Sequence, residues 1–158
     1  MTAADLGRLA EALASADQPP AIFRALDSLS GEAIGHRLFT IMRFDPERSE
    51  VERLYSTMPD VYRVGGRKKK TDTAWANHIL HDRKVYRAND AAGIRAAFDD
   101  HATILGLGLE SVLNIPVVFD GRCVGTMNLL HEAGWYRPSD EETGIVLGSF
   151  LIPVLIGR

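Results

Sequence analysis

The two clearest strand-like stretches of the sequence are separated by the dipeptide Asp120-Gly121, and this arrangement constrains the fold more than any other feature. Residues 110–118 and 123–131 each have the length and the apolar content of a strand. Asp-Gly is a preferred connection between antiparallel strands. The sequence therefore predicts a hairpin of two paired strands in the second half of the chain.

Regular patterns on either side of this hairpin predict further helices and strands. Apolar residues at helical spacing, including Leu9 and Leu26, predict two helices within residues 1–35. Residues 58–73 follow no regular pattern and are predicted to be a loop; loops of this length in compact domains are usually functional or mobile. The other predicted strands and short helices lie, in order, at 36–44, 51–57, 73–80, 85–87 and 91–107.

The last predicted helix begins at a capping box formed by Ser139 and Glu142 and ends at Gly157. Beyond Ile145 it has almost no polar residues, and a helix that is apolar all round must be covered on more than one side. The sheet covers one side, and a second subunit is the simplest cover for the other. We therefore expect a homodimer through the terminal helices, with a bend in the last turn at Pro153.

A length of 158 residues suits one domain. We expect that domain to span residues 1–158, with N-terminal helices at 1–35, the sheet and a pocket at 36–137, and a C-terminal helix at 138–158.

Charge and composition exclude several classes of function. Eighteen Lys and Arg against twenty-one Asp and Glu give a net charge of −3, which argues against a nucleic-acid partner. The single Cys123 cannot form an internal disulfide, and His78 and His81 offer only two metal ligands, so we expect no metal or cofactor. The apolar stretch 145–156 is shorter than the ~20 residues of a membrane span. Because no signal peptide is present, we expect a cytoplasmic protein with no membrane partner.

The strand pair also resembles a known family. Ser111-Val-Leu-Asn114-Ile-Pro116-Val117 and Val124-Gly125-Thr126-Met-Asn128-Leu129 are similar to the paired strands of GAF domains, in which a proline in the first and a glycine in the second are typical. The resemblance covers about residues 20–157. It implies an α+β fold: an antiparallel sheet with the N- and C-terminal helices on one face and a small-molecule pocket under short helices and loops on the other.

The resemblance also carries expectations about function. GAF domains are usually sensory modules attached to kinases, cyclases, phosphodiesterases or transcription activators, whereas we expect this chain to be a free-standing module. One free-standing family with this fold reduces methionine sulfoxide with several cysteines, and Cys123 alone cannot repeat that chemistry. Covalent attachment of a bilin to Cys123 is also disfavoured, because this residue lies on a predicted strand.

The hairpin can be paired in two registers, which place different side chains on the pocket face. A two-residue turn places Asn114 with His131 and puts Asn128 on the opposite face. A three-residue loop at 119–121 pairs Val118 with Arg122 and gathers Asn114, Thr126 and Asn128 on one face. The second register leaves an apolar face for the helices, so we prefer it. That apolar face consists of Leu113, Ile115, Val117, Met127 and Leu129.

Ten residues are our candidates for binding a ligand. Neutral hydrogen-bonding side chains on the sheet would give direction, although these groups could instead bond locally or to trapped water. Cations would attract an anion, and aromatic rings would supply apolar contact. Lys69 and Lys70 are interpreted as solvated charges. The candidates are Arg53, Ser56, Tyr62, Lys68, Trp75, Asp100, His101, Asn114, Thr126 and Asn128.

Together with the resemblance to GAF domains, these residues predict a dimeric GAF-type module that binds a small polar, anionic metabolite. The loop 58–73 would close over the ligand, and the terminal helices would pass on the signal. The alternative is a small metabolic enzyme, an isomerase, lyase or hydrolase, in which Lys68, His101 and Tyr62 perform acid–base chemistry. A third hypothesis is an interaction protein with a vestigial pocket.

Overall fold

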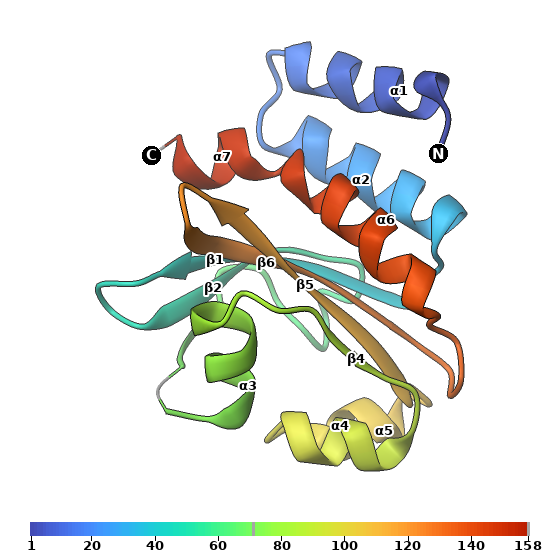
Figure 1. Ribbon diagram of the computed structural model, residues 1–158, viewed down its shortest axis with the longest axis vertical. Coiled ribbons are helices and arrows are strands. Elements are labelled where there is room, and N and C mark those ends of the chain that lie inside the picture. The colour runs from blue at the N-terminus through green and yellow to red at the C-terminus, as the bar shows by residue number, and fades with distance from the viewer. Residues whose placement is uncertain (71, 158) are drawn as a thin grey trace.

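The computed structural model describes residues 1–70 and 72–157, which form an antiparallel sheet with helices on both faces (Figure 1). Thr71, within the expected loop, and Arg158, at the end of the expected last helix, lie outside the described residues. The strand order is β3-β2-β1-β6-β5-β4. The strands are β1 (Leu38–Asp45), β2 (Glu50–Ser56), β3 (Arg67–Lys69), β4 (Tyr86–Ala88), β5 (Ser111–Phe119) and β6 (Arg122–His131).

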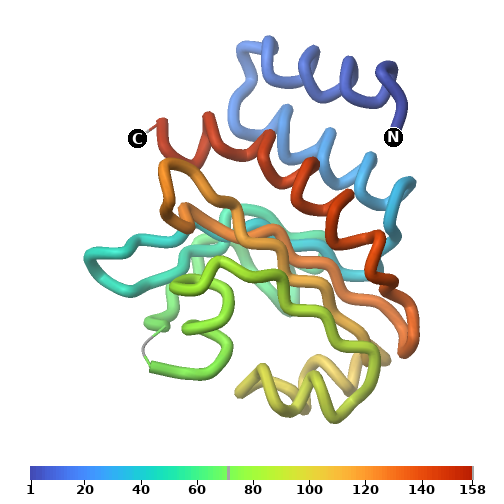
Figure 2. The backbone as a smooth tube through the Cα atoms, viewed as in Figure 1, coloured from blue at the N-terminus to red at the C-terminus, as the bar shows by residue number. Residues whose placement is uncertain are grey.

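The longer helices and the shorter helices cover opposite faces of the sheet. The longer α2 and α6 lie against one face together with α7, and α1 packs outside α2 (Figure 1). The backbone trace shows that α6 lies beside α2, so helices from the two halves of the chain form one layer (Figure 2). This arrangement confirms the α+β class. The helices are α1 (Ala3–Ala14), α2 (Pro20–Ala33), α3 (Ala74–Ala76), η1 (Asn77–His81), α4 (Ala91–Ala97), α5 (His101–Gly106), α6 (Pro138–Ser149) and α7 (Ile152–Ile156).

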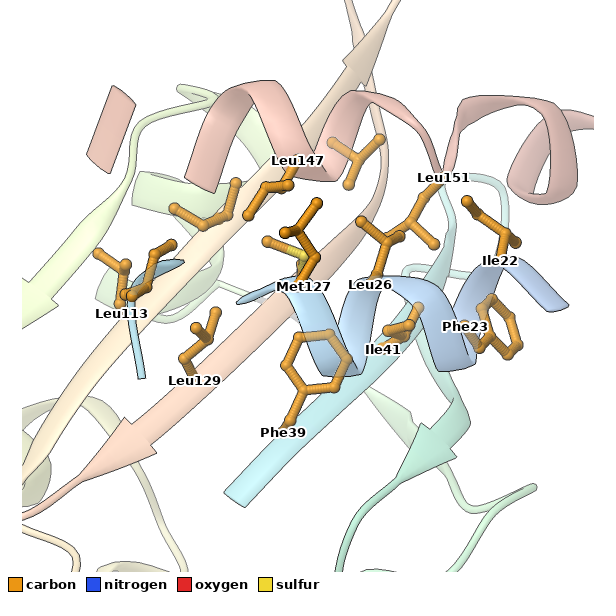
Figure 3. Packing of buried hydrophobic residues seen from close by; sticks show 14 of the residues in the cluster. Ile22, Phe23, Leu26, Phe39, Ile41, Leu113, Met127, Leu129, Leu147 and Leu151 are labelled. Atoms are coloured by element: carbon orange, nitrogen blue, oxygen red, sulfur yellow. The ribbon is translucent and has the colours of Figure 1, made fainter. Parts of the chain in front are cut away.

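The main core lies between the long helices and the sheet (Figure 3). Leu26 of α2, Met127 of β6 and Leu147 of α6 point toward one another there, and each is completely buried. Burying one such side chain contributes about 1.5–3 kcal/mol, so this layer supplies much of the stability. Two smaller apolar clusters lie on the other face, under α3, α4 and α5.

The hairpin confirms the predicted set of polar side chains on one face of the sheet, but it does not have the predicted three-residue loop. Asp120 and Gly121 form a two-residue turn with φ angles of 52° and 72°, and Phe119 pairs with Arg122, so the three-residue loop is wrong. A bulge in β6 then shifts the register by one residue. As a result Asn114 pairs with Asn128, and Thr126 shares their face.

Two further expectations need correction. The C-terminal helix is not a single bent helix: it breaks after Ser149 and resumes as α7, with Pro153 in the first turn. The N-terminus of α6 is capped by a hydrogen bond in which the Arg137 backbone N–H donates to the Asp140 carboxylate (2.8 Å). The expected pair Ser139 and Glu142 does not form this cap. The loop 58–73 is likewise not continuous, because Arg67–Lys69 forms β3 against β2.

Candidate functional site

A cavity of about 320 Å³ lies on the face of the sheet opposite the long helices. All strands except β4 contribute side chains to it, and α3, α5 and the segment before α5 cover it. The wall is mainly apolar, with a group of cationic residues from β2, from β3 and from Lys70, which directly follows β3. The lining residues are Leu38, Thr40, Met42, Val51, Arg53, Tyr62, Gly66, Arg67, Lys68, Lys70, Trp75, Phe98, Asp100, Ile104, Asn114, Asn128 and Leu130.

The cavity is cationic although the whole chain is acidic. Its lining holds four cationic side chains and one carboxylate, that of Asp100, whereas the chain has a net charge of −3. Two of the cations are already paired: Arg67 lies 3.4 Å from Glu50, and Lys68 Nζ lies 3.6 Å from Asp99. Within residues 1–70 and 72–157, no carboxylate oxygen lies within 4.0 Å of Arg53 or Lys70.

Burial makes these two unpaired cations less stable in their charged forms. It lowers the pKa of the Lys70 ammonium, and the neighbouring Lys68 cation lowers this pKa further. Burial also lowers the pKa of the Arg53 guanidinium, although an arginine stays charged at any physiological pH. An anion bound between them would stabilise both charges.

Tyr62 connects the loop before β3 to the far wall of the cavity. Its hydroxyl donates to Asp100 Oδ2 at 2.9 Å, and the Arg53 guanidinium carbon lies 5.1 Å from the centre of its ring. Burial raises the pKa of the Tyr62 phenol, and the Asp100 carboxylate raises it further, so Tyr62 remains a protonated donor. Residues 58–66 therefore form one edge of the cavity.

The neutral polar groups of the sheet form a closed network. The Trp75 Nε1–H donates to Asn114 Oδ1 (3.1 Å), and Asn114 Nδ2 donates to Asn128 Oδ1 (2.8 Å). Asn128 Nδ2 in turn donates to the hydroxyls of Thr40 (3.2 Å) and Thr126 (3.1 Å). These groups bond mainly to one another, which is the local bonding that we gave as the alternative to ligand contact.

Seven of the ten candidate residues line the cavity and three do not. Ser56 turns to the backbone, where its Oγ accepts from the Met58 N–H at 3.1 Å. Thr126 is completely buried, and its hydroxyl accepts a hydrogen bond from the Asn128 amide. His101 is the first residue of α5, and Ile104, one turn later, is the residue of that helix that lines the cavity. The seven lining residues are Arg53, Tyr62, Lys68, Trp75, Asp100, Asn114 and Asn128.

Sequence reasoning missed two of the cations and most of the apolar wall. The sequence predicts a solvated charge at Lys70, but Lys70 lines the cavity and its Nζ lies 4.9 Å from the centre of the Trp75 ring. For Lys70 the missing signal was the alternation of a strand, which places Lys68 and Lys70 on one side and Lys69 on the other. The same alternation does not predict the second missed cation, Arg67, which also lines the cavity. The side of β1 that carries Leu38 and Met42 was visible in the sequence and faces the cavity.

Other candidate groups have structural partners elsewhere. The His78 ring lies 2.7 Å from the carbonyl oxygen of Val85, and the described residues contain no group of three side chains suited to a metal ion. Burial raises the pKa of the Cys123 thiol to about 11, so it is not a reactive thiolate. His131 stacks on Trp135 at 3.6 Å between ring centres. No helix among the described residues is both long enough and apolar enough to cross a membrane.

Comparison with solved structures places this architecture among GAF domains. The GAF domain of a phosphoenolpyruvate-protein phosphotransferase from Acinetobacter superposes with a TM-score of 0.75 at 14% identity, over 99% of this chain and 96% of that one. A GAF domain/HD domain protein from Geobacter sulfurreducens gives 0.72 at 16% identity, over 94% and 95%. The chromophore-binding domain of an unusual bacteriophytochrome from R. palustris gives 0.71 at 12% identity, over 96% and 59%.

The sequence itself gives an independent assignment. No curated protein matches it significantly. The sequence model described as GAF domain matches residues 12–149, most of the chain and all of the sheet. On the combined evidence of that match and the shared fold, the chain belongs to the GAF domain family.

Proposed function

We propose that this protein is a binding module for a small organic anion, held in the cavity between Arg53 and Lys70. The observation that carries the proposal is the pair of half-buried cations without a carboxylate partner among the described residues, in a cavity with an otherwise mainly apolar wall. A buried cation is costly unless it is paired, and a bound anion supplies the missing charge.

The family and the size of the cavity support this proposal. GAF domains often bind small molecules, and the similar R. palustris domain is a chromophore-binding domain. A volume of about 320 Å³ lies at the lower end of the range for small-molecule sites, roughly 300–1,000 Å³. The site therefore suits a small metabolite.

We further propose that the module works as a cytoplasmic homodimer. Ile145, Val146 and Ile156 of the last two helices are 51%, 43% and 44% exposed, and a second subunit would cover them. Arg43 of β1 donates to the Val154 carbonyl oxygen at 3.1 Å, which links a strand of the cavity to α7. Ligand binding could reach the subunit interface along this connection.

The enzyme alternative gains no support from the geometry. Tyr62 and Lys68 line the cavity, but His101 does not, so the three residues required for the proposed acid–base chemistry do not converge there. Lys68 is also exposed and lies beside Asp99. A binding module is therefore the function that we propose.

The experiment is to denature protein purified from its host and identify the released molecules by mass spectrometry. We expect one organic anion in a stoichiometric amount. Arg53→Met should reduce this amount at least tenfold, because it removes a charge that the ligand pairs with, while the exposed Arg95→Met serves as the control. A neutral molecule, or a pair related as substrate and product, would contradict the proposal.

A further inference from the structure

We infer that the bound anion is an aromatic monocarboxylate, or an equally flat and apolar monoanion, whose charge lies close to its ring. This inference rests on the proposed function and names the chemical class of its ligand. It follows from three features of the cavity: its apolar wall, the hydrogen-bonded network of neutral polar groups on the sheet, and the position of the two unpaired cations.

The wall is apolar and partly aromatic. Trp75 and Phe98 both line the cavity, with ring centres 6.4 Å apart and ring planes inclined at 53°. Leu38, Ile104 and Leu130 complete the wall on the side of β1, α5 and β6. Aromatic rings favour offset or edge-to-face contact with other rings, so this corner suits a flat ring more than a flexible polar chain.

The neutral polar groups of the sheet that line the cavity leave few hydrogen-bonding atoms free for a ligand. These groups belong to Thr40, Asn114 and Asn128. Asn128 uses both N–H groups of its amide within the network, and the Trp75 indole N–H is already bound to Asn114. A hydroxyl on the body of the ligand would lose its water without gaining an equivalent partner, which costs about tenfold or more in affinity. The cavity therefore selects against sugars, hydroxy acids and other ligands with a polar body.

The unpaired cations fix the position and the size of the ligand's charge. Arg53 has five N–H donors, of which Nη1 donates to the Arg63 carbonyl oxygen (3.2 Å), while Nε–H is buried without a hydrogen-bond partner among residues 1–70 and 72–157. Lys70 Nζ lies 4.9 Å from the centre of the Trp75 ring, so an anion paired with it lies beside the aromatic wall. The negative charge of the Asp100 carboxylate offsets one of these two positive charges. One net positive charge therefore remains, and it favours a monoanion.

The test uses the fluorescence of Trp75 as a report from inside the cavity. The chain has two tryptophans, and Trp135 lies away from the cavity, where its indole donates to the Ile34 carbonyl oxygen. In a Trp135→Phe background, phenylacetate and cinnamate should change the Trp75 emission in a saturable way. The neutral 2-phenylethanol and the ring-free anion citrate should each bind at least tenfold more weakly, and so should AMP, which joins a flat ring to a sugar. Calorimetry on the unmodified protein checks each result.

Matched variants test the position of the charge. Arg53→Met and Lys70→Met should each weaken phenylacetate binding about tenfold and leave 2-phenylethanol unchanged. Lys69→Met, one residue from Lys70 but exposed on the other side of β3, should leave both affinities unchanged.

The outcomes separate the inference from the proposed function. Citrate or AMP binding more tightly than both aromatic carboxylates, with the affinity dependent on Arg53, would overturn the aromatic class and keep the anion-binding module. Equal binding of 2-phenylethanol and phenylacetate would overturn the role of the charge. If calorimetry detects no binding of any anion, both the inference and the proposed function are wrong.

Discussion

At the scale of single residues, the same amide can hold a ligand or hold the fold, and its neighbours decide which. Asn114 is 2% exposed, and it accepts a hydrogen bond from Trp75 while donating one to Asn128. Its structural task is therefore to satisfy the indole N–H and to fix the ring that forms one wall of the cavity. Trp75 can present a defined aromatic face only because that N–H has a buried partner.

We predict that Asn114→Ala lowers the free energy of unfolding by about 2–3 kcal/mol, because it leaves the buried indole N–H of Trp75 and the side-chain oxygen of Asn128 without this hydrogen-bond partner. Urea denaturation followed by circular dichroism measures this loss. The exposed Asn77→Ala serves as the control and should change the stability by no more than about 0.5 kcal/mol. A loss below about 1 kcal/mol together with a large drop in ligand affinity would show that Asn114 contacts the ligand instead.

At the scale of elements, the segment before β3 is attached at both sides of the cavity. Its Tyr62 hydroxyl reaches Asp100 just before α5, and the Gly65 and Gly66 backbone bonds to Arg53 of β2. β3 then pairs with β2 at the edge of the sheet, so the basic run is ordered by its partner strand and not by its own sequence. The irregular segment before β3, residues 58–66, is therefore shorter than the loop expected from the sequence.

We predict that Tyr62→Phe accelerates amide hydrogen exchange across residues 60–66 about fivefold, because it removes one hydrogen bond worth about 1 kcal/mol. Exchange followed by mass spectrometry measures the change. The control is Tyr86→Phe, which removes a hydroxyl that donates to the Gly93 carbonyl oxygen outside this segment. Unchanged exchange in Tyr62→Phe would mean that the hydroxyl does not hold the segment in place.

At the scale of the whole molecule, the two faces of the sheet have different tasks. One face carries the main core under α2, α6 and α7, and the other carries the cavity. The outer side of α6 and α7 leaves three large apolar side chains partly exposed. The main core and the cavity thus lie on separate faces of the sheet, so a change in the cavity need not disturb the main core.

We predict that the protein is a homodimer at micromolar concentration, with twice the 17.4 kDa mass of one chain by light scattering. Ile145→Lys combined with Val146→Lys should produce a monomer, because two charges would be buried without partners. Val64→Lys places a charge on an equally exposed apolar residue far from these helices and should leave the dimer intact. A monomeric mass for the unmodified protein would rule out this assembly.

Local patterns in the sequence determined the fold class and seven of the residues that line the cavity. Helical spacing in the first helices and the alternation of the hairpin report which side of each element is buried, and this information is local to the chain. For that reason the α+β class was predictable, and Asn114 and Asn128 were placed on the correct face.

Only the tertiary structure decided how partners from distant segments meet. The bulge in β6, the pairing of β3 with β2, the position of His101 outside the cavity lining and the closed network around Asn114 all depend on such contacts. Lys70 shows the reason most clearly. A basic run has the same sequence whether it is solvated or paired, and only the position of β2 and Trp75 places Lys70 in the lining of the cavity.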